Sequence, residues 1–312
     1  MVRALQEATK PAVTFNSIAD EWQDKRLPML HISSQFIIPA RLRLHVRPFF
    51  GEMAVEDIRT GVVNTWIRKL SDEAGLEPKT IRNCWTDFRS VVNWYCRQLD
   101  KPKVSWYPDL PKLPDREQRW FTQEEANQII NAAKGQYRVL FHLAARTGMR
   151  CGELCALRVE DLKLDHGVIE VTRSVWHGIE GPTKTKAGKR TVYLDSEAAC
   201  MLRQYLAGRQ TGRVFQSRAG RPLVSTDITQ GQLKPIYKRL GIAHGGMHAF
   251  RHGRVSHMRV NAMPDDFVTS QVGHSSLRIT SQYTHFEHKQ KREMAERLPS
   301  CTQNGNLYST VN

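Results

Sequence analysis

The stretch DKPKVSWYPDLPKLPDREQR, residues 100–119, divides the sequence into two parts. Its prolines, at positions 102, 108, 111 and 114, remove backbone donors, and the stretch shows no apolar periodicity. This composition is typical of an extended linker between domains. We therefore predict two domains that are joined by residues 100–118.

Residues 14–99, before this linker, carry apolar side chains at helical spacing. TFNSIADEWQDKRL places Phe15, Ile18 and Trp22 on one helical face, and PKTIRNCWTDFRSVVNWYCRQ repeats the pattern further along. Two more periodic runs lie between them. Four helices with short connections predict a small all-α bundle, preceded by an N-terminal tail of residues 1–13.

Residues 119–290, after the linker, mix helix and strand signals. WFTQEEANQII begins a helix, with Thr122 and Glu125 at capping-box spacing. GVIEVT and KRTVYL are rich in β-branched residues and predict short strands. Four later segments have helical patterns: 196–207, 226–240, 246–261 and 264–272. The predicted fold is therefore two-domain and mainly α, with a small all-α bundle and an α+β domain containing a small antiparallel sheet. The polar tail, residues 291–312, is a candidate for docking onto a neighbouring protomer.

The positive charge is concentrated in the second part of the chain. Lys and Arg total 46 against 31 acidic residues, for a net charge of +15. Residues 1–110 hold 16 basic and 13 acidic residues, whereas residues 111–312 hold 30 and 18. Such a field attracts polyanions, of which nucleic acid is the usual one. A basic protein without a nucleic-acid partner is the alternative.

Several function classes lack their sequence signals. No apolar run approaches the roughly 20 residues of a membrane span, and the N-terminus lacks the apolar core of a signal peptide. Six cysteines in 312 residues do not form a disulfide scaffold, so we expect reduced thiols and a cytoplasmic protein. The sequence contains no GxxxxGK[ST], GxSxG or CxxC pattern.

Two segments place cationic side chains where one anion could be bound. TGMRCGEL puts Arg150 just after a helix-ending Gly148, with Glu153 one helical turn on, where its carboxylate could orient a guanidinium or a nearby imidazole. A surface ion pair is the alternative. GGMHAFRHG puts His248 and Arg251 on one helical face.

The histidines around His248 also suggest a metal site. His244, His248, His252 and His257 lie close together in the sequence. However, two glycines separate His244 from the helix, and neither an HExxH pattern nor a nearby acidic ligand accompanies them. We therefore expect no metal and no cofactor.

Two further segments complete the set of candidate residues. PTKTKAGKRTVYL gathers basic side chains around a predicted hairpin tip, namely Lys184, Lys186, Lys189 and Arg190. A lysine there could reach a DNA backbone and donate a proton, although a solvated loop is the common alternative. VGHSSLRITSQYTHF, residues 272–286, places His274 nine residues before Tyr283, which could also be a buried aromatic residue.

Together these residue types suit phosphoryl transfer through a covalent tyrosine. A tyrosine has a pKa of about 10, so only on the order of one in a thousand is ionised at pH 7. A cationic pocket would lower that pKa and stabilise the charge of the transition state. One well-placed donor typically contributes about 3–4 kcal/mol, so two arginines and two histidines could act without a metal.

The motifs TGMRCGEL, KTK, HAFRH, VGHSS and QYTH occur in the order and approximate spacing of the phage-integrase, or tyrosine recombinase, family. The chain resembles this family over residues 14–290, and its bundle is similar to the core-type DNA-binding domain of the family. Phe250 and Tyr193 replace the Leu and Pro that are common at these positions. Some members carry an additional N-terminal arm-binding domain. Only 13 residues precede the bundle here, so either that domain is absent or the chain is truncated.

The residues that match the family's catalytic set are Arg150, Lys184, His248, Arg251, His274 and Tyr283. The resemblance implies that the two arginines grip the scissile phosphate, that His248 and His274 assist them, and that Tyr283 forms a 3′-phosphotyrosine. Lys184 matches the lysine general acid, with Lys186 as the alternative. Glu153 matches a supporting acidic position, and Lys186, Lys189 and Arg190 are expected to contact DNA.

The resemblance implies a site-specific DNA recombinase whose catalytic domain is residues 119–290. Its expected partners are double-stranded DNA recombination sites, a homotetramer on paired sites, and an accessory DNA-bending or directionality factor. Two alternatives remain open: a type IB topoisomerase-like enzyme that relaxes DNA, and a DNA-binding regulator without catalysis.

Overall fold

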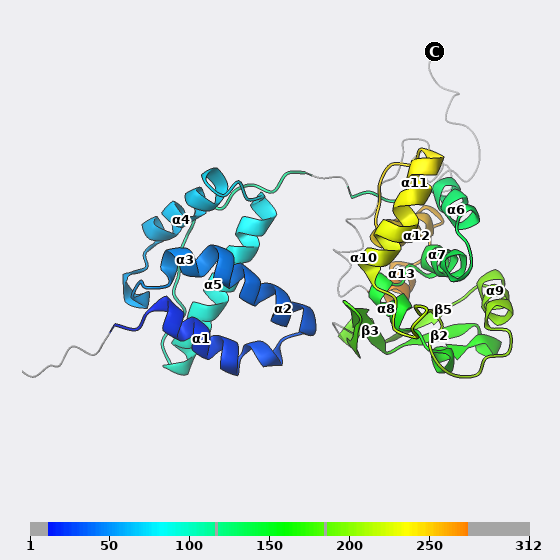
Figure 1. The fold of residues 1–312 in the computed structure, drawn as a ribbon, viewed down its shortest axis with the longest axis horizontal. Helices are drawn as coiled ribbons and strands as arrows, with labels where there is room; N and C mark the ends of the chain where they lie inside the picture. The colour runs from blue at the N-terminus through cyan, green and yellow to red at the C-terminus, as the bar shows by residue number, and fades with distance from the viewer. Residues whose placement is uncertain (1–11, 116–117, 184–185, 274–312) are drawn as a thin grey trace, which may run out of the picture. The chain divides into compact units, whose positions relative to one another are not determined.

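The computed structural model describes residues 12–115, 118–183 and 186–273 (Figure 1). The chain divides between Glu117 and Gln118 into two compact units. The predicted fold class is confirmed, because both units are mainly helical and the second contains a small antiparallel sheet. Among the described residues, no helix is long and apolar enough to cross a membrane.

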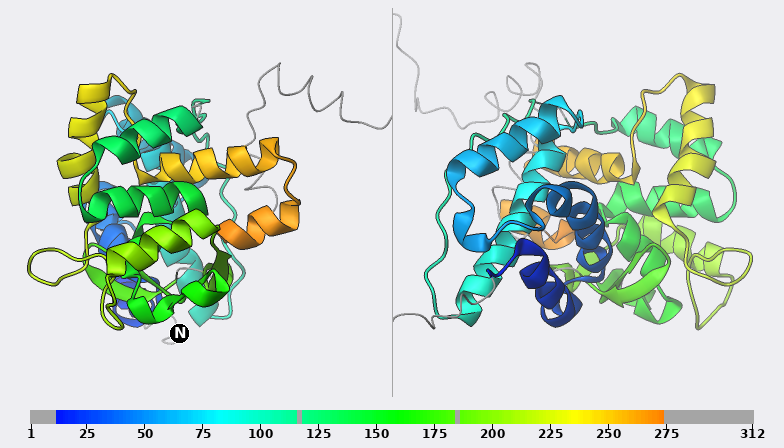
Figure 2. Two further views of the ribbon diagram at one scale, coloured as in Figure 1. Left: turned by 90° about the vertical axis from the view of Figure 1, so that its right-hand side faces the viewer. Right: turned by 60° about the vertical axis from the view of Figure 1, so that its left-hand side comes forward.

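The first unit is a helical bundle built around one long helix. Its helices are α1 (Phe15–Lys25), α2 (Ile32–Arg41), α3 (Arg47–Phe50), α4 (Thr60–Asp72) and α5 (Pro78–Gln98), with a π-helical turn at Leu42–Val46. Helix α5 contacts α1, α2 and α4 (Figure 2). Phe88 of α5 lies in an aromatic core, with the ring centroids of Phe50 and Trp106 at 4.4 and 5.3 Å. Apolar side chains at helical spacing therefore meet along one helix, as the sequence pattern predicts.

Part of the proline-rich segment after α5 packs against the helical bundle of the first unit. Trp106 is buried in the bundle core and donates its indole N–H to the Ile58 carbonyl. Further along, Arg82 donates to the Pro111 carbonyl at 2.9 Å. A single aromatic side chain has no periodicity, so the sequence pattern contains no signal for this packing.

The second unit packs its helices around α7. Its helices are α6 (Gln123–Ala132), α7 (Gln136–Thr147), α8 (Cys151–Ala156), α9 (Ser196–Leu206), α10 (Ser225–Ile228), α11 (Lys234–Leu240), α12 (Met247–Val260) and α13 (Asp265–Val272). Helix α7 contacts α6, α9 and α12. The rings of Phe141 and Phe250 stack 5.7 Å apart between α7 and α12. This core fixes the start of α12, which carries two of the predicted site residues.

The strands of the second unit form two small sheets. The strands are β1 (Leu162–Lys163), β2 (Val168–Val171), β3 (Arg173–Trp176), β4 (Ile179–Pro182) and β5 (Arg190–Tyr193). The antiparallel order is β1-β2-β5 in one sheet and β3-β4 in the other. The sequence predicted one hairpin between β2 and β5, whereas the structure adds the β3–β4 hairpin between them. His177 and Gly178 form its tight turn, with φ of 47° and 81°.

Candidate active site

Arg150 lies where the chain passes from α7 into α8. Helix α7 ends at Gly148, which adopts the left-handed conformation with φ 66°. Arg150 is then the N-cap residue of α8, and its backbone N–H donates to Glu153 Oε2 at 2.9 Å. Its guanidinium Nη1 donates to Glu153 Oε1 at 2.8 Å. The Glu153 side chain is only 2% exposed, so this contact is a buried orienting interaction rather than a surface ion pair.

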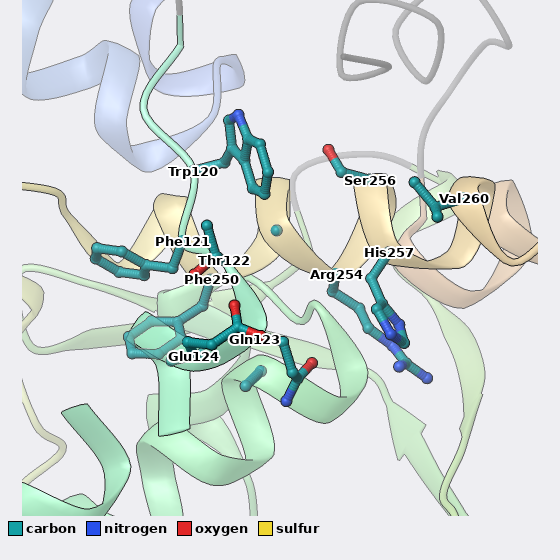
Figure 3. Close-up of a pocket in the computed structure, with 13 residues that line it drawn as sticks. Trp120, Phe121, Thr122, Gln123, Glu124, Phe250, Arg254, Ser256, His257 and Val260 are labelled. Atoms are coloured by element: carbon teal, nitrogen blue, oxygen red, sulfur yellow. The ribbon is translucent and has the colours of Figure 1, made fainter. Parts of the chain in front are cut away.

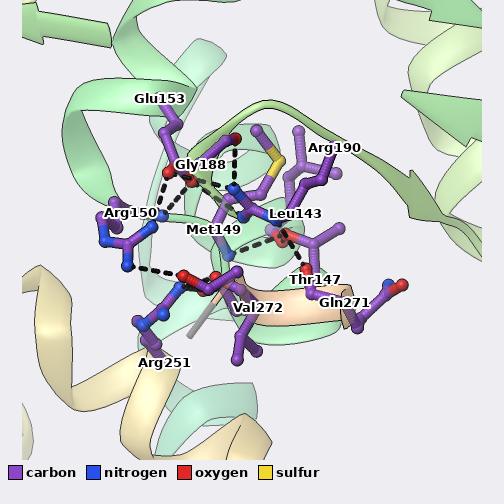
Figure 4. Close-up of polar contacts among 12 residues, drawn as sticks. Leu143, Thr147, Met149, Arg150, Glu153, Gly188, Arg190, Arg251, Gln271 and Val272 are labelled. Atoms are coloured by element: carbon purple, nitrogen blue, oxygen red, sulfur yellow. Dashed lines mark hydrogen bonds and ion pairs between the residues drawn. The ribbon is translucent and has the colours of Figure 1, made fainter. Parts of the chain in front are cut away.

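Arg251 lies at the start of α12 and ties two helix ends together. Its buried guanidinium donates to the Gly148 carbonyl at 2.8 Å and to the Val272 carbonyl at 2.6 Å. Arg150 Nη2 donates to the next carbonyl, that of Gly273, at 2.9 Å. The two arginines therefore converge on neighbouring peptide groups at the end of α13 (Figure 4).

His248, one turn before Arg251, lies at the same end of α12 with part of its surface exposed and the rest packed against protein. Desolvation by the surrounding protein, with the nearby charges of Arg251 and Arg150, lowers the pKa of its imidazole despite the opposing charge of Glu153. His248 is therefore neutral at pH 7, so its ring presents one donor and one acceptor nitrogen. The structure thus brings together Arg150, Glu153, His248 and Arg251.

His252 lies behind His248, with the ring centroids 6.1 Å apart. Burial, with the neighbouring His248 and Arg251, lowers the pKa of His252 to about 4. Among the described residues, no three His, Cys, Asp or Glu side chains form a group that could hold a metal ion. His244 instead lies against the ring of Tyr237, 5.7 Å between centroids.

Arg190 has a different environment from the one the sequence predicted. Its side chain is 7% exposed, and Nη1 and Nη2 donate to the two oxygens of Glu153 at 3.1 and 2.9 Å. Its Nε donates to the Gln271 carbonyl at 3.0 Å, and Nη1 also donates to the Gly188 carbonyl. Each guanidinium nitrogen thus contacts protein, whereas the neighbouring Lys189 is exposed.

The Glu153 carboxylate lies between two cations in a buried place. Burial alone would raise the pKa of this carboxyl, but the hydrogen bonds and charges of Arg190 and Arg150 outweigh burial and hold the pKa below its ordinary value. Glu153 is therefore ionised at neutral pH.

Gln271 supports the site but is not among the residues predicted from the sequence. This side chain is 1% exposed, accepts from the Tyr193 N–H at 3.1 Å and donates to the Tyr193 carbonyl at 2.7 Å. Its amide thereby pairs with β5 as a strand would. The sequence signal for Gln271 is a polar residue among the apolar positions of α13, and this signal does not indicate that Tyr193 is its partner.

The remaining predicted residues lie outside the described residues. These are Lys184, His274, Tyr283 and the side chain of Lys186. Lys189 lines a groove of about 520 Å³ between β5 and α13, together with Tyr193 and Gly273.

A second hollow on the same unit lacks the predicted residues. It has a volume of about 320 Å³ and lies along the later turns of α12 (Figure 3). Its lining is largely apolar, with Trp120, Phe121 and Phe250, and includes Arg254 and His257. None of Arg150, Glu153, His248 and Arg251 lines it, so this hollow is separate from the predicted site residues.

Comparisons with known proteins converge on one family. Residues 119–290 match the phage integrase family. A tyrosine recombinase XerC-like protein of Caldanaerobacter subterraneus is 29% identical over 283 residues, which cover 79% of this chain and 72% of the relative. Tyrosine recombinase XerC of Xanthomonas campestris pv. campestris is 30% identical over 233 residues, which cover 70% and 67%.

Solved structures share the fold at low sequence identity. The Tn1549 transposon integrase in complex with transposon right end DNA has a TM-score of 0.75 at 18% identity, covering 92% of this chain and 99% of that one. A lambda integrase dimer bound to a COC′ core site has a TM-score of 0.62 at 20% identity, covering 88% and 77%. The fold of this chain is thus shared with these two integrase structures.

Proposed function

Because the chain belongs to the phage integrase family and is a tyrosine-type site-specific recombinase, we propose that it cuts and rejoins duplex DNA through a 3′-phosphotyrosine formed by Tyr283. The observation that carries this proposal is the convergence of Arg150 and Arg251 on consecutive carbonyls, Gly273 and Val272, just before His274 in the sequence. The proposed partner is duplex DNA at a recombination site.

The proposed cleavage is an in-line displacement at the scissile phosphorus. The Tyr283 hydroxyl gives its proton to solvent water, and its oxygen forms a bond to phosphorus while the bond to the 5′ oxygen breaks. Lys184, or Lys186, gives a proton to that 5′ oxygen. The reverse attack by a 5′-hydroxyl rejoins a strand, so the phosphodiester bond energy is conserved and no nucleotide is hydrolysed.

The arginine cluster, which consists of Arg150 and Arg251, supports this chemistry electrostatically. Protein contacts orient Arg150 and Arg251, and donors fixed in this way stabilise a developing charge at little reorganisation cost. Neutral His248 offers a further hydrogen bond to a non-bridging oxygen. We assign Arg150, Arg251, His248 and His274 to the phosphate, and Glu153 to the orientation of Arg150.

The two units take distinct roles in this proposal. Residues 14–99 are the core-type DNA-binding domain, and residues 119–290 are the catalytic domain. Lys186 and Lys189 would contact the DNA backbone. Strand exchange would take place in a homotetramer on paired sites, with residues 291–312 docking onto a neighbouring protomer and an accessory factor bending or directing the DNA.

The nucleophile is tested with nicked suicide duplexes prepared from a genomic fragment library. Wild-type protein should become covalently attached to DNA, visible as a shifted band on a denaturing gel, and sequencing the trapped ends gives the target. Tyr283→Phe should bind the same DNA with unchanged affinity and form no adduct. Tyr107→Phe, which changes a tyrosine with 81% of its surface exposed in the first unit, is the matched control.

The outcomes separate the alternatives. An adduct that persists in Tyr283→Phe would contradict the assigned nucleophile. Binding by wild type without any adduct would support a regulator without catalysis. Relaxation of supercoils without exchange between two marked sites would support a topoisomerase-like enzyme.

A further inference from the structure

Three arginine side chains donate hydrogen bonds to the backbone carbonyls at the end of α13. The consecutive carbonyls of Gln271, Val272 and Gly273 accept hydrogen bonds from Arg190, Arg251 and Arg150, respectively. The last carbonyls of a helix lack partners within the helix and carry partial negative charge, so guanidinium donors stabilise them. The helix end that precedes His274 is thereby held from β5, α12 and α8 at once (Figure 4).

Arg190 also acts on Arg150 through a shared acid. Glu153 accepts two hydrogen bonds from Arg190 and one from the Arg150 guanidinium. The fork of Arg190 fixes both carboxylate oxygens, which is the geometry that a guanidinium provides and an ammonium does not. With Glu153 at 2% exposure and Arg190 at 7%, the pair is shielded from water, whereas Arg150 remains 35% exposed at the candidate site.

The packing around Gly273 leaves no room for a side chain at this position. Gly273 adopts φ 69°, and a Cβ there would lie 2.8 Å from the Ala187 carbonyl and 3.0 Å from the Arg190 side chain. Ala187, within the predicted lysine hairpin, therefore lies against the end of α13, and the Arg190 side chain packs beside it.

We infer that Arg190 is a positioning residue of the recombination site, because it orients Arg150 through Glu153 and holds the end of α13 from which the chain continues to His274. This inference rests on the proposed function. It replaces the expectation that Arg190 contacts DNA.

A positioning role and a phosphate-contacting role of Arg190 predict different effects on the rate of adduct formation and on DNA affinity. A positioning role lowers the rate of adduct formation at saturating DNA and leaves Kd and its salt dependence unchanged. A phosphate-contacting role weakens binding and reduces the salt slope by about 1. We therefore compare wild type, Arg190→Gln and Arg190→Lys by single-turnover cleavage of the suicide DNA and by fluorescence anisotropy.

We expect Arg190→Gln to slow adduct formation on the order of 100-fold, as the loss of one well-placed transition-state donor does, with Kd within about twofold of wild type. Arg190→Lys keeps the charge but not the fork, so it should also be slow. The matched control is Arg213→Gln, which removes an arginine that is 19% exposed and paired with Glu180 at 2.8 Å. This control should cleave at the wild-type rate.

A double-mutant cycle with Glu153→Gln tests whether Arg190 acts on Arg150 through Glu153. If Arg190 acts through Glu153, the Arg190→Gln, Glu153→Gln double variant should be no more than about threefold slower than the slower single variant. Thermal unfolding is measured for every variant, and where Arg190→Gln does not fold, the cycle is run with Arg190→Lys.

Each outcome has a defined meaning. A wild-type rate in Arg190→Gln, fully additive losses in the cycle, or a raised Kd with an unchanged rate would each overturn the inference. An absence of adduct with wild-type protein would instead overturn the proposed function, and the two failures are therefore distinct.

Discussion

At the residue scale, His252 is a buried imidazole that must stay neutral in the folded protein. Its folded-state pKa of about 4 lies below the ordinary value of about 6.5, which applies to the unfolded chain. The unfolded state therefore binds a proton more readily at intermediate pH. The stability that depends on neutral His252 is fully present above about pH 6.5 and is lost as the pH falls toward 4.

We expect His252→Gln to reduce the slope of unfolding free energy against pH between about 6.5 and 4.5. The full effect for one such group is about 3 kcal/mol, since one pKa unit corresponds to about 1.4 kcal/mol. The pKa values of His248 and His257 are lowered as well, so part of the slope should remain. Urea unfolding across this range measures it, and His166→Gln, at an exposed position, is the control. Equal slopes in wild type and His252→Gln would refute the assignment.

Contacts between residues close together in the sequence could be predicted, whereas contacts between residues far apart in the sequence could not. Arg150 and Glu153 are three residues apart on one helix, so their contact could be anticipated from spacing alone. Arg190 and Glu153 are 37 residues apart, on a strand and a helix, and no local pattern encodes that pair. Arg190 therefore resembled its exposed neighbour Lys189 in the sequence, although the two side chains have different environments.

At the element scale, Gln271 joins α13 to the edge of β5. Gln271→Met keeps the side-chain length but leaves the Tyr193 N–H and carbonyl without these contacts. We expect a loss of about 1–3 kcal/mol in unfolding free energy, which is the usual cost of an unsatisfied buried polar group. Adduct formation should slow in parallel, because the same helix end carries the carbonyls that bind Arg150 and Arg251.

Chemical denaturation and single-turnover cleavage measure both effects. Gln204→Met, at an exposed position on α9, is the matched control and should change neither. An unchanged unfolding free energy in Gln271→Met would show that the amide contacts do not hold α13.

Helices and strands that carry a clear local signal, such as a capping box or a run of β-branched residues, could be predicted from the sequence. The capping box of Thr122 and Glu125 is present at the start of α6, and β2 pairs with β5 as their β-branched residues predicted. The β3–β4 hairpin was missed, because its residues 173–182 lack a strong strand pattern and resembled a loop. Its position depends on tertiary packing instead. Gly152 of α8 lies so close to β3 that a Cβ there would be 2.5 Å from the Val175 carbonyl.

At the scale of the whole molecule, the net charge of +15 determines how the protein should bind DNA. Each phosphate that is neutralised releases condensed counterions, so affinity falls steeply with salt. With about six phosphates neutralised, Kd should rise about 1,000-fold between roughly 50 and 200 mM salt. Fluorescence anisotropy over this range tests the expectation, and a flat dependence would contradict a binding mode dominated by the basic surface.

The division of the chain was predictable, whereas the extent of the connecting segment was not. Prolines between residues 102 and 114 indicated a break in regular structure, and the chain divides into its two compact units between Glu117 and Gln118. Yet Trp106 belongs to the bundle core and Asp109 pairs with Asn64. An irregular backbone can still pack one large side chain, and composition alone does not distinguish such a segment from a free linker.

The contact between Arg150 and the Gly273 carbonyl spans 123 residues of sequence. During synthesis the ribosome releases Arg150 long before it releases this acceptor, so the hydrogen bond forms only after the end of α13 has emerged. A chain that stops before residue 273 can still form the contact of Arg150 with Glu153, but it lacks the Gly273 carbonyl. The contact between Arg150 and Gly273 is therefore a late step of folding on the ribosome.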